Sequence, residues 1–408
     1  MTLIPRPDHT ISRANISSHA LKVLYRLKNA GYEAYLVGGG VRDLLLQRTP
    51  KDFDIATSAH PEEVNRVFRN CRLIGRRFRL AHIYFGHDVI EVATFRASEQ
   101  AEKRLTNQTG RILHDNVYGT LEEDAQRRDF TVNALYYNIA DFSLCDFTSG
   151  YAHLQAKQLC LIGDPDMRFR EDPVRLLRAI RFAAKLDFLI EQRCVEPIQT
   201  MGHLLQDIPA ARLFDEVLKL FLHGHALATL QMLQDYQLFE QLFPGATNAL
   251  TEDTQFVAFL RQAMRNTDQR VQAGKPVTPA FLFAVFLWAG VKQADSADEI
   301  QERSELVIKQ QQQRVSIPRR ITHPMRDIWS MQPRFFQRTG KRPLRLLAHP
   351  KFRAAYDFFL LRASIGEVDS SIAQWWTELQ EVSDAEKKKR VENPSRARNH
   401  GPKPNLES

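Results

Sequence analysis

A run of three glycines and a pair of aspartates are the residues of this chain whose types and spacing suggest chemistry. Gly38, Gly39 and Gly40 follow a short apolar run, and Asp52 and Asp54 lie shortly after them. Glycines lack a Cβ atom, so the backbone can adopt positive φ and bring its N–H groups close to an anion at a helix N-terminus. On a strand, residues two apart project from the same face, about 7 Å apart along the chain. Two such carboxylates beside a phosphate-binding loop suit magnesium, which shares its oxygen ligands with substrate phosphates. The pattern therefore predicts a site for a nucleoside triphosphate and Mg²⁺, with Asp52 and Asp54 as the metal ligands.

Other phosphate-binding loops do not fit this stretch. A dinucleotide-binding G-x-G-x-x-G loop would place its third glycine at Asp43, and a Walker loop would need a Gly-Lys-Ser/Thr sequence that does not follow. Three glycines alone are often only a flexible loop, and an isolated D-x-D is more often a solvated turn. Their joint occurrence on one strand, loop, helix and strand favours a ligand site.

Strands and helices alternate around these residues. Ser17 or Ser18 is expected to cap a helix that ends near Gly31, and Pro61 is expected to begin another. Glu91 lies in a predicted strand and could supply a further carboxylate to the metals, although a solvent-facing glutamate is the simpler interpretation. The polar stretch 97–114 is expected to be a mobile loop. Further strands are predicted at 81–85, 89–95, 135–139 and 144–147, the first two joined by a turn at 86–88.

A second charged stretch contains Arg127, Arg128 and Asp129 and precedes the apolar segment 130–135. We expect Asp129 to cap a helix that begins at Phe130, with both arginines just outside it. Their guanidinium groups are then placed to bind phosphate oxygens. A charged helix start with ordinary i,i+4 pairs is the simpler alternative.

A third stretch begins where the pattern changes from strands to helices. Asp172 is expected to cap a helix with Pro173 at its first position, and Arg175 lies three residues on, so the two side chains share a face. A carboxylate that accepts from an exocyclic amine, beside a guanidinium that donates to the ring nitrogen, is complementary to adenine and also to cytosine. A capped helix with a salt bridge is the simpler alternative. The pair would reject G and U but could not separate ATP from CTP.

These three stretches read GGxVRD followed by DFD, RRDFTxNAL and EDxxR, and together they resemble the motifs of one enzyme family. It is the family of the class II tRNA nucleotidyltransferases and the bacterial poly(A) polymerases, which add nucleotides to RNA 3′ ends without a template. The resemblance implies triphosphate contacts from Arg127 and Arg128 and a functional, catalytic carboxylate at Asp129 together with Asp52 and Asp54. It also implies that Asp172 and Arg175 read the nucleobase.

The predicted mechanism uses two metal ions. Asp52 and Asp54 bind both ions, one of which lowers the pKa of the RNA 3′-hydroxyl while the other neutralises the leaving pyrophosphate. The triphosphate is positioned by the glycine loop and by three arginines. These nucleotide-binding residues are Gly38, Gly39, Gly40, Arg42, Arg127 and Arg128.

The branch of the family is predicted from residues 73–83. Their sequence, LIGRRFRLAHI, resembles the bacterial poly(A) polymerase signature G-R/K-R/K-F-x-h-x-H, where CCA-adding members carry a Gly-Thr-Val type of sequence. We therefore predict a polynucleotide adenylyltransferase that adds AMP from ATP to RNA 3′ ends and so promotes RNA turnover. Addition of CCA ends to tRNA is the enzymatic alternative. An RNA-binding protein with a degenerate head is disfavoured, because such a protein would be expected to have lost one of the two aspartates.

Composition agrees with a polyanionic partner. The chain has 408 residues and a formal net charge of +8, and its basic clusters predict RNA contacts from Arg76, Arg77, Arg79, Arg342 and Arg345. Four scattered cysteines without paired spacing predict reduced thiols in a cytoplasmic protein. The longest apolar run, 280–291, is much shorter than the ~20 residues that a membrane span needs. The expected partners are RNA 3′ ends, ATP and possible RNA-decay machinery.

The expected fold is an α+β head, a nucleotidyltransferase palm with a mixed sheet and helices, followed by an all-α neck, body and tail. Gln310–Gln313 is a candidate linker within the helical part, and most aromatic residues after Ile317 are expected to be core. The expected divisions are a catalytic head at 1–163, a neck with nucleobase-reading helices at 164–215, a helical body at 216–316, a basic and aromatic RNA-binding region at 317–384 and a disordered basic tail at 385–408.

Overall fold

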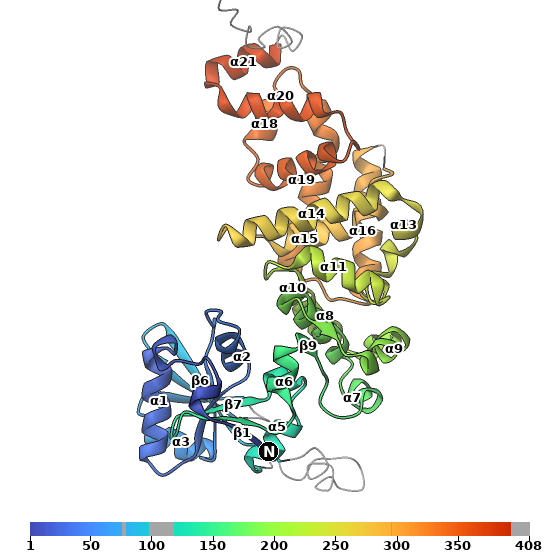
Figure 1. Ribbon diagram of the computed structural model, residues 1–408. Coiled ribbons are helices and arrows are strands. Elements are labelled where there is room, and N and C mark those ends of the chain that lie inside the picture. Colours follow the sequence, from blue (N-terminus) through green and yellow to red (C-terminus); the bar gives the residue numbers. More distant parts are fainter. Residues whose placement is uncertain (76–78, 98–117, 295, 393–408) are drawn as a thin grey trace, which may run out of the picture. The chain divides into compact units, whose positions relative to one another are not determined.

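The computed structural model describes residues 1–75, 79–97, 118–294 and 296–392 and divides the chain into two compact units. The first unit comprises Met1–Arg175 and Leu186–Pro197, and the second comprises Leu176–Lys185 and Ile198–Ser408. The labelled strands belong to the first unit, and the described part of the second is built from helices (Figure 1). This confirms the predicted fold class, an α+β head followed by helices. The residues of the predicted neck are shared between the two units.

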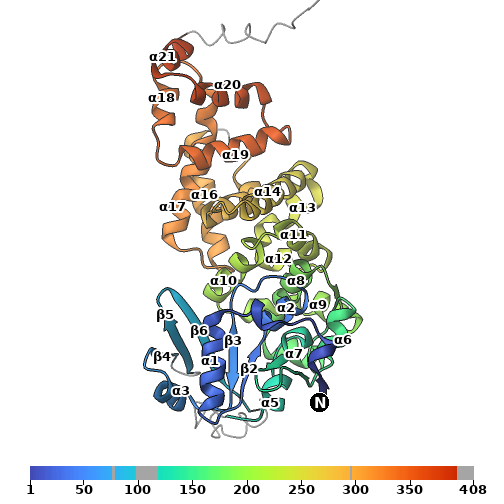
Figure 2. The same ribbon diagram turned by 60° about the vertical axis from the view of Figure 1, so that its left-hand side comes forward.

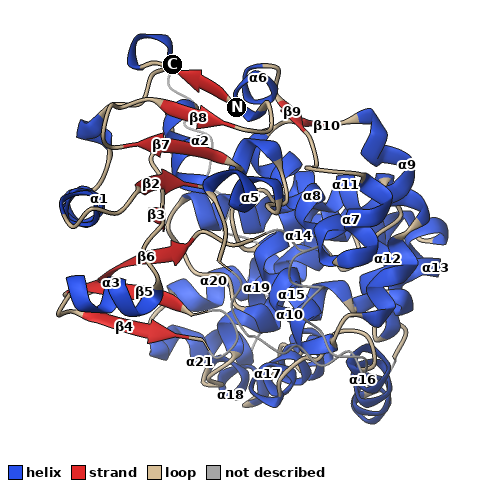
Figure 3. Cartoon of the chain, turned by 90° about the horizontal axis from the view of Figure 1, so that it is seen from below, coloured by secondary structure: helices blue, strands red, loops and turns tan. Residues whose placement is uncertain are grey.

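A mixed sheet of eight strands is the centre of the first unit (Figure 3). Its order is β1-β8-β7-β2-β3-β6-β5-β4, and β3 and β6 are parallel whereas the other neighbouring pairs are antiparallel. The strands are β1 (Thr2–Ile4), β2 (Ala34–Val37), β3 (Asp54–Thr57), β4 (Cys71–Ile74), β5 (Leu80–Phe85), β6 (Asp88–Thr94), β7 (Leu135–Asn138) and β8 (Leu144–Asp146).

One face of this sheet is covered by α1 (Ser18–Asn29), α2 (Gly39–Leu45) and α3 (Pro61–Val67) (Figure 2). The side chains between sheet and helices include Leu24, Val41, Ile55, Val64 and Ile83, each buried. Ser17 caps α1 as predicted, since its Oγ atom accepts from the Ala20 N–H at 3.0 Å. Alternation along β3 puts Asp54 on the opposite face from Ile55.

The opposite face is covered in part by α5 (Leu121–Gln126). Its Ala125 packs with Val37, Ala56 and Tyr136 from β2, β3 and β7. Along the chain, α7 (Pro165–Glu171) and α8 (Val174–Leu186) connect the two strands of a short parallel pair. The remaining elements that reach this unit are η1 (Arg6–Asp8), η2 (Arg13–Asn15), η3 (Thr131–Asn133), α6 (Gly150–Gln155), β9 (Gln158–Leu159), β10 (Leu189–Ile190) and α9 (Gln192–Thr200).

The segment after Asp129 differs from the prediction. It forms the single 3₁₀ turn η3 and no helix capped by Asp129, because β7 begins at Leu135 and leaves room for only one turn. The Asp129 carboxylate instead accepts from the backbone N–H of Phe130 at 2.8 Å. The expected loop at 97–114 falls almost entirely outside the described residues.

The second unit is helical, and its aromatic side chains are largely core. Trp329, Phe335 and Trp376 are buried, which confirms the prediction for this region. Its further elements are η4 (Gly202–Asp207), α10 (Ala210–Phe221), α11 (Ala226–Asp235), α12 (Phe239–Leu242), η5 (Pro244–Ala246), α13 (Thr247–Glu252), α14 (Thr254–Gln272), α15 (Pro279–Phe286), η6 (Trp288–Gly290), α16 (Ala297–Gln312), α17 (Arg319–Ser330), η7 (Gln332–Phe336), α18 (Arg342–Leu347), α19 (Phe352–Ser364), α20 (Ser370–Glu381) and α21 (Asp384–Glu392).

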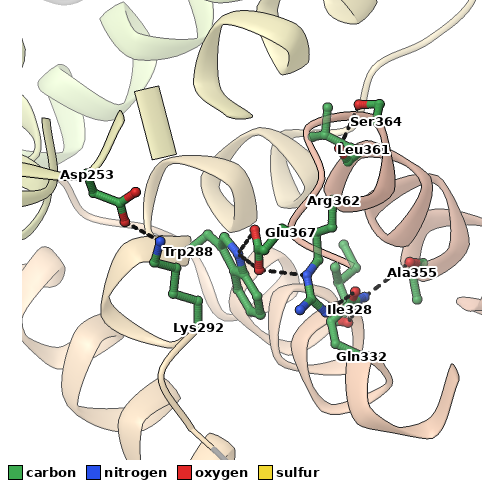
Figure 4. Close-up of polar contacts among 10 residues, drawn as sticks. All are labelled: Asp253, Trp288, Lys292, Ile328, Gln332, Ala355, Leu361, Arg362, Ser364 and Glu367. Carbon is green, nitrogen blue, oxygen red and sulfur yellow. Dashed lines mark hydrogen bonds and ion pairs between the residues drawn. The ribbon is translucent and has the colours of Figure 1, made fainter. Parts of the chain in front are cut away.

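A buried ion pair between Arg362 and Glu367 is joined by a hydrogen bond to Trp288, which precedes residue 316 (Figure 4). Arg362 Nε lies 2.9 Å from Glu367 Oε1, and Trp288 Nε1 donates to the same carboxylate at 3.1 Å. Arg362 Nη1 also donates to Gln332 Oε1 at 3.2 Å. The predicted body and RNA-binding region thus pack together within one unit.

Two predictions for this unit were wrong. The candidate linker at Gln310–Gln313 lies at the end of α16, where Gln311 is 3% exposed and donates to the Leu242 carbonyl at 2.8 Å. The disordered tail was predicted to begin too early, because residues 384–392 form α21. That helix buries Val391 and is supported by an ion pair of Arg390 with Glu378. Residues 393–408 lie outside the described part of the chain.

The cysteines and the apolar helix agree with their predictions. All four cysteines are free thiols, and burial raises the pKa of Cys145 to about 11. Helix α15 begins at Pro279 as predicted and buries its apolar side chains. A search of the described residues finds no helix with the length and apolar character needed to cross a membrane.

Candidate active site

Asp54 lies at the first position of β3, between Val37 of β2 and Glu91 of β6. Burial raises the pKa of Asp54, and the negative charges of Glu91 and Asp52 add to this effect while Arg128 opposes it, so that the pKa rises to about 6. The Asp54 carboxylate therefore lies close enough to Asp52 and Glu91 for their charges to matter. Such a crowded carboxylate is stabilised in its ionised form by a cation.

The glycine loop meets this carboxylate directly. Gly38 has φ 73°, and a Cβ atom added to it would lie 3.7 Å from Asp54 Oδ2 and 3.7 Å from Arg128 Nη1. A Cβ atom at Gly40 would lie 3.2 Å from the Asp52 carbonyl oxygen. Glycine at position 38 therefore serves both the left-handed backbone and the open space between a carboxylate and a guanidinium. The structure thus brings together Gly38, Asp54 and Arg128 from the first two predicted motifs.

The aspartates fit a divalent cation. Among the described residues, neither Asp52, which is exposed, nor the partly buried Asp54 forms a hydrogen bond or ion pair through its carboxylate. The described chain offers no cluster of three or more His, Cys, Asp or Glu side chains arranged as a complete metal site. A cation held here would therefore take its other ligands from water and substrate phosphates, the arrangement expected for metals that act on nucleoside triphosphates.

Arg128 is held in place by two side chains that project from neighbouring elements. Its Nε atom donates to the Tyr136 hydroxyl at 2.8 Å, and its Nη2 atom lies 3.1 Å from Asp124 Oδ2. Burial by itself lowers the pKa of Arg128, but the interactions with Tyr136 and Asp124 outweigh this effect and keep the pKa above its ordinary value. Arg128 therefore remains a fixed cation beside the glycine loop. Its neighbour Arg127 donates from Nη1 to the Ala97 carbonyl at 3.0 Å.

Arg42 and Asp129 belong to one buried network. The Arg42 guanidinium is 2% exposed and bonds Asp43 Oδ1 through Nε at 2.8 Å and Asn133 Oδ1 through Nη1 at 2.7 Å. Asn133 Nδ2 in turn donates to Asp129 Oδ1 at 3.3 Å. This burial places Arg42 beneath the glycine loop, where its contacts support the loop. The network fixes Asp129 relative to the first motif.

The third motif is tied to the second by Arg168 of α7. Its Nη2 atom donates to the carbonyls of Arg127 and Arg128, each at 2.8 Å. Arg175 Nη1 donates to the Arg168 carbonyl at 2.7 Å and to Glu171 Oε2 at 3.2 Å. Asp172 Oδ1 accepts from the Val174 N–H at 3.3 Å and so caps α8. The predicted base-reading pair and the predicted phosphate-binding arginines are therefore linked through α7.

Several residues in these contacts were not assigned by sequence reasoning. Asn133 lies inside the RRDFTxNAL motif and Glu171 is the first letter of EDxxR, so the motifs contained them without a role. Arg168 had no local signal, because the two carbonyls that it contacts lie 41 and 40 residues away in the sequence. Asp124 lies four residues before Arg128, a spacing that could have indicated the pair, and Tyr136 lies eight residues after it. Glu91 was weighed as a further carboxylate for the metals, with a solvent-facing glutamate as the simpler interpretation. Its side chain is 50% exposed, and its backbone pairs with that of Asp54, so its role toward the metals stays a prediction.

The predicted RNA-contacting arginines are partly described. Arg342 and Arg345 are exposed on α18, and Arg79 is exposed and paired with Glu62 at 2.7 Å. Arg76 and Arg77 lie outside the described residues. Their role in RNA binding stays a prediction.

Three families of known proteins match successive parts of the chain. They are the poly A polymerase head domain at residues 34–160, the probable RNA and SrmB-binding site of polymerase A at 187–250 and the polymerase A arginine-rich C-terminus at 292–406. Among solved structures, the Bacillus stearothermophilus CCA-adding enzyme in complex with CTP is similar in fold, with a TM-score of 0.62 at 23% identity over 94% of this chain and 88% of that one.

Curated relatives separate the two branches of the family. The CCA-adding enzyme of Streptococcus uberis is 39% identical over 235 residues, which cover 58% of this chain and 57% of that protein. Poly(A) polymerase I of Salmonella typhi is 49% identical over 95% of this chain and 88% of that protein, and the Haemophilus influenzae enzyme is 45% identical over 97% and 91%. Enzymes of this nucleotidyltransferase family use divalent metals. The chain belongs to the bacterial poly(A) polymerase family and is a polynucleotide adenylyltransferase, as its motifs predicted.

Proposed function

We propose that this enzyme transfers AMP from ATP to RNA 3′ ends at the site formed by Asp52, Asp54 and the glycine loop, with Mg²⁺ as its metal. The proposal rests on the position of two charged groups beside Gly38. A Cβ atom added to Gly38 would lie 3.7 Å from Asp54 Oδ2 and 3.7 Å from Arg128 Nη1. A carboxylate, a fixed guanidinium and free backbone space converge there. A bound metal would activate the RNA 3′-hydroxyl and neutralise charge on the leaving pyrophosphate.

In this mechanism the residues around Gly38 position the triphosphate. The backbone N–H groups at the start of α2 would face the phosphates of the triphosphate. Arg128 would supply a positive charge, and its side chain needs no further ordering because Tyr136 and Asp124 already hold it. Arg127 is the neighbouring phosphate ligand. Arg42 would fix the glycine loop through its buried contacts, and Asn133 would connect Asp129 to the same network.

Asp172 and Arg175 would read the base. Arg175 is 9% exposed and held by the Arg168 carbonyl and Glu171, so its guanidinium has little freedom to adapt to a different base edge. Adenine and cytosine both complement an acceptor beside a donor, whereas guanine and uracil present the reverse pattern. The pair therefore supports selection of ATP over GTP and UTP.

The RNA contacts, the partner proteins and the cellular location are proposed from the arginines, the family matches and the cysteines. RNA would contact Arg79, Arg342 and Arg345 in addition to the unassigned Arg76 and Arg77, and the arginine-rich match at 292–406 supports this. We further propose association with RNA-decay proteins, supported by the match of residues 187–250 to a probable RNA and SrmB-binding site. Free buried thiols are consistent with action in the reducing cytoplasm.

The decisive test compares Asp54→Asn with Asp88→Asn, an exposed aspartate of β6. Each protein is given labelled ATP, Mg²⁺ and an unstructured oligoribonucleotide. We expect Asp54→Asn to lose AMP incorporation by a factor of at least about 10³ while it binds RNA normally, because only metal-dependent charge stabilisation is removed. Asp88→Asn should retain activity. Turnover by Asp54→Asn at the normal rate would refute the metal assignment.

A further inference from the structure

The sheet face that carries Asp54 continues beyond the candidate active site. Asp54 pairs with Glu91 of β6, Glu91 pairs with His82 of β5, and His82 pairs with Arg72 of β4. Paired residues of adjacent strands project from the same face. The four side chains therefore form one row that leads from the candidate active site to the edge of the sheet.

This outer part of the face is accessible to solvent. Arg72 is exposed, the Glu91 side chain is 50% exposed and the apolar Val89 and Ile74 beside them are 40% and 43% exposed. The alternate residues of the same strands, such as Ile83 and Val92, are buried in the core on the opposite face. The sheet thus presents an accessible surface that carries both charged and apolar side chains.

The side chains on this surface suit single-stranded RNA. The Arg72 guanidinium carbon lies 5.5 Å from the centroid of the Tyr84 ring, and the His82 ring lies 6.4 Å from the same ring. His82 Nε2 lies 3.5 Å from Glu91 Oε1. Aromatic rings on an accessible antiparallel sheet stack on unpaired bases, and an adjacent arginine pairs with a phosphate. The surface therefore has the chemistry of a stacking platform.

The geometry of the reaction indicates that this platform binds the RNA and not ATP. Arg128 meets Gly38 on the β2 and β7 flank of Asp54, so the triphosphate belongs to that flank. In phosphoryl transfer the attacking and leaving oxygens lie roughly in line across the transferred phosphorus. The RNA 3′-oxygen must then approach from the other flank, where Glu91 and His82 lie.

We propose that Arg72, His82 and Tyr84 form the subsite for the last nucleotides of the RNA, with Tyr84 stacked on one base and Arg72 paired with a phosphate. The proposal rests on Asp54 as the reaction centre. Strands β5 and β4 lie about 10 Å and 14 Å from β3 at the usual strand spacing, so the contacted nucleotides are close to the 3′ end. Stacking tolerates any base, which suits an enzyme that extends without a template. The proposal also gives His82, the last position of the signature G-R/K-R/K-F-x-h-x-H, a role as a member of the RNA subsite.

The first experiment measures steady-state kinetics with an oligoribonucleotide and ATP. Tyr84→Ala should raise the KM for RNA about tenfold, in line with the usual energy of one stacked base, and Tyr84→Phe should restore it. The KM for ATP and the kcat should stay within about twofold. Arg72→Ala should also raise the RNA KM, whereas Arg66→Ala should not, because Arg66 is an exposed arginine of α3 on the opposite face.

The second experiment tests for direct stacking with oligonucleotides that carry one abasic site at each of the last four positions. At the position that Tyr84 contacts, the abasic site should raise the RNA KM of the wild type but have little further effect on Tyr84→Ala. Fully additive effects at all four positions would overturn the subsite. The outcome is separable from the proposed function. Loss of activity in Asp54→Asn with an unchanged RNA KM in Tyr84→Ala would overturn the subsite alone, whereas activity in Asp54→Asn would remove the reaction centre on which it rests.

Discussion

Arg42 Nη1 donates to the side-chain oxygen of Asn133 at 2.7 Å, and this bond joins two motifs that lie 91 residues apart in the chain. Both side chains are buried, Arg42 at 2% and Asn133 at 7% exposure. The bond therefore fixes the helix after the glycine loop against the segment that carries Asp129. The conformation of the candidate active site depends on this buried pair.

Replacement of Asn133 by alanine should test that dependence. The variant leaves one nitrogen of a buried guanidinium without its acceptor, which costs about 2 kcal/mol of unfolding free energy. It also removes the contact from Asn133 Nδ2 to Asp129, which links Asp129 to the first motif, so the KM for ATP should rise. Urea unfolding and steady-state kinetics measure both effects. Asn138→Ala, which removes a partly buried asparagine of β7, is the control. An unchanged KM for ATP in Asn133→Ala would contradict the positioning role.

Arg168 should act on ATP binding without touching it. Its two bonds hold the carbonyls of Arg127 and Arg128, the two arginines proposed to bind phosphate. Arg168→Met should therefore displace both arginines and raise the KM for ATP about tenfold, equivalent to ~1.4 kcal/mol. The KM for RNA should change little. Arg170→Met is the matched control, because Arg170 is an exposed arginine of the same helix. Equal kinetics for the two variants would show that the carbonyl contacts are dispensable.

Arg175 should determine which nucleotides are rejected. Arg175→Ala removes the donor that faces the ring nitrogen, and we expect the preference for ATP over GTP and UTP to fall at least tenfold. Competition between labelled nucleotides on one oligonucleotide measures this preference directly. Arg193→Ala, an exposed arginine of the first unit, should keep the preference of the wild type. If Arg175→Ala lost activity equally with all four nucleotides, its role would be structural.

Asp54 should reduce stability at neutral pH when no metal is present. Its pKa is raised from 3.8 to about 6 by burial first and by Glu91 second, so the folded protein binds the proton more tightly than the unfolded chain. This carboxyl favours folding fully below pH 3.8, and that contribution is lost as the pH rises through about 6. In EDTA at pH 7.5, Asp54→Asn should therefore be more stable than the wild type, by an amount on the order of 1 kcal/mol.

Urea unfolding at two pH values checks the sign of this effect. The advantage of Asp54→Asn should shrink at pH 4.5, where the wild-type carboxyl is protonated. Glu91→Gln should give a smaller advantage of the same sign, since it removes one of the charges that raise the pKa. A lower stability of Asp54→Asn at pH 7.5 would show that the carboxylate is compensated within the protein.

Arg362 and Glu367 should determine the stability of the second unit (Figure 4). Removal of one partner from a buried ion pair costs about 3–5 kcal/mol, because the other charge is left unpaired. Glu367→Gln and Arg362→Met should therefore each destabilise strongly, whereas the double variant Arg362→Met with Glu367→Gln should lose less than the sum. Arg353→Met, which breaks an exposed pair with Asp357, is the control. Additive losses in the double variant would contradict the coupling, and thermal unfolding measures all four proteins.

The local chemistry of this protein was determined by its sequence. The cap at Ser17 and the hairpin at 86–88 depend on neighbours within a few residues, where backbone preference and side-chain periodicity act directly. The three motifs, by their resemblance to one enzyme family, indicated the family to which the chain belongs and predicted that Gly38, Asp54 and Arg128 share a site.

Contacts between distant segments were decided by the tertiary structure. The sequence placed Arg42 among the phosphate ligands, whereas the fold buries it against Asn133, because α2 packs next to η3. The sequence suggested a linker at Gln310–Gln313, but Gln311 donates to the Leu242 carbonyl, a buried partner that no local pattern reveals. The row from Asp54 through Glu91 and His82 to Arg72 exists only because β3 and β6 pair in parallel in one register. Periodicity can predict that a strand has two faces, but strand order and register decide which residues share one.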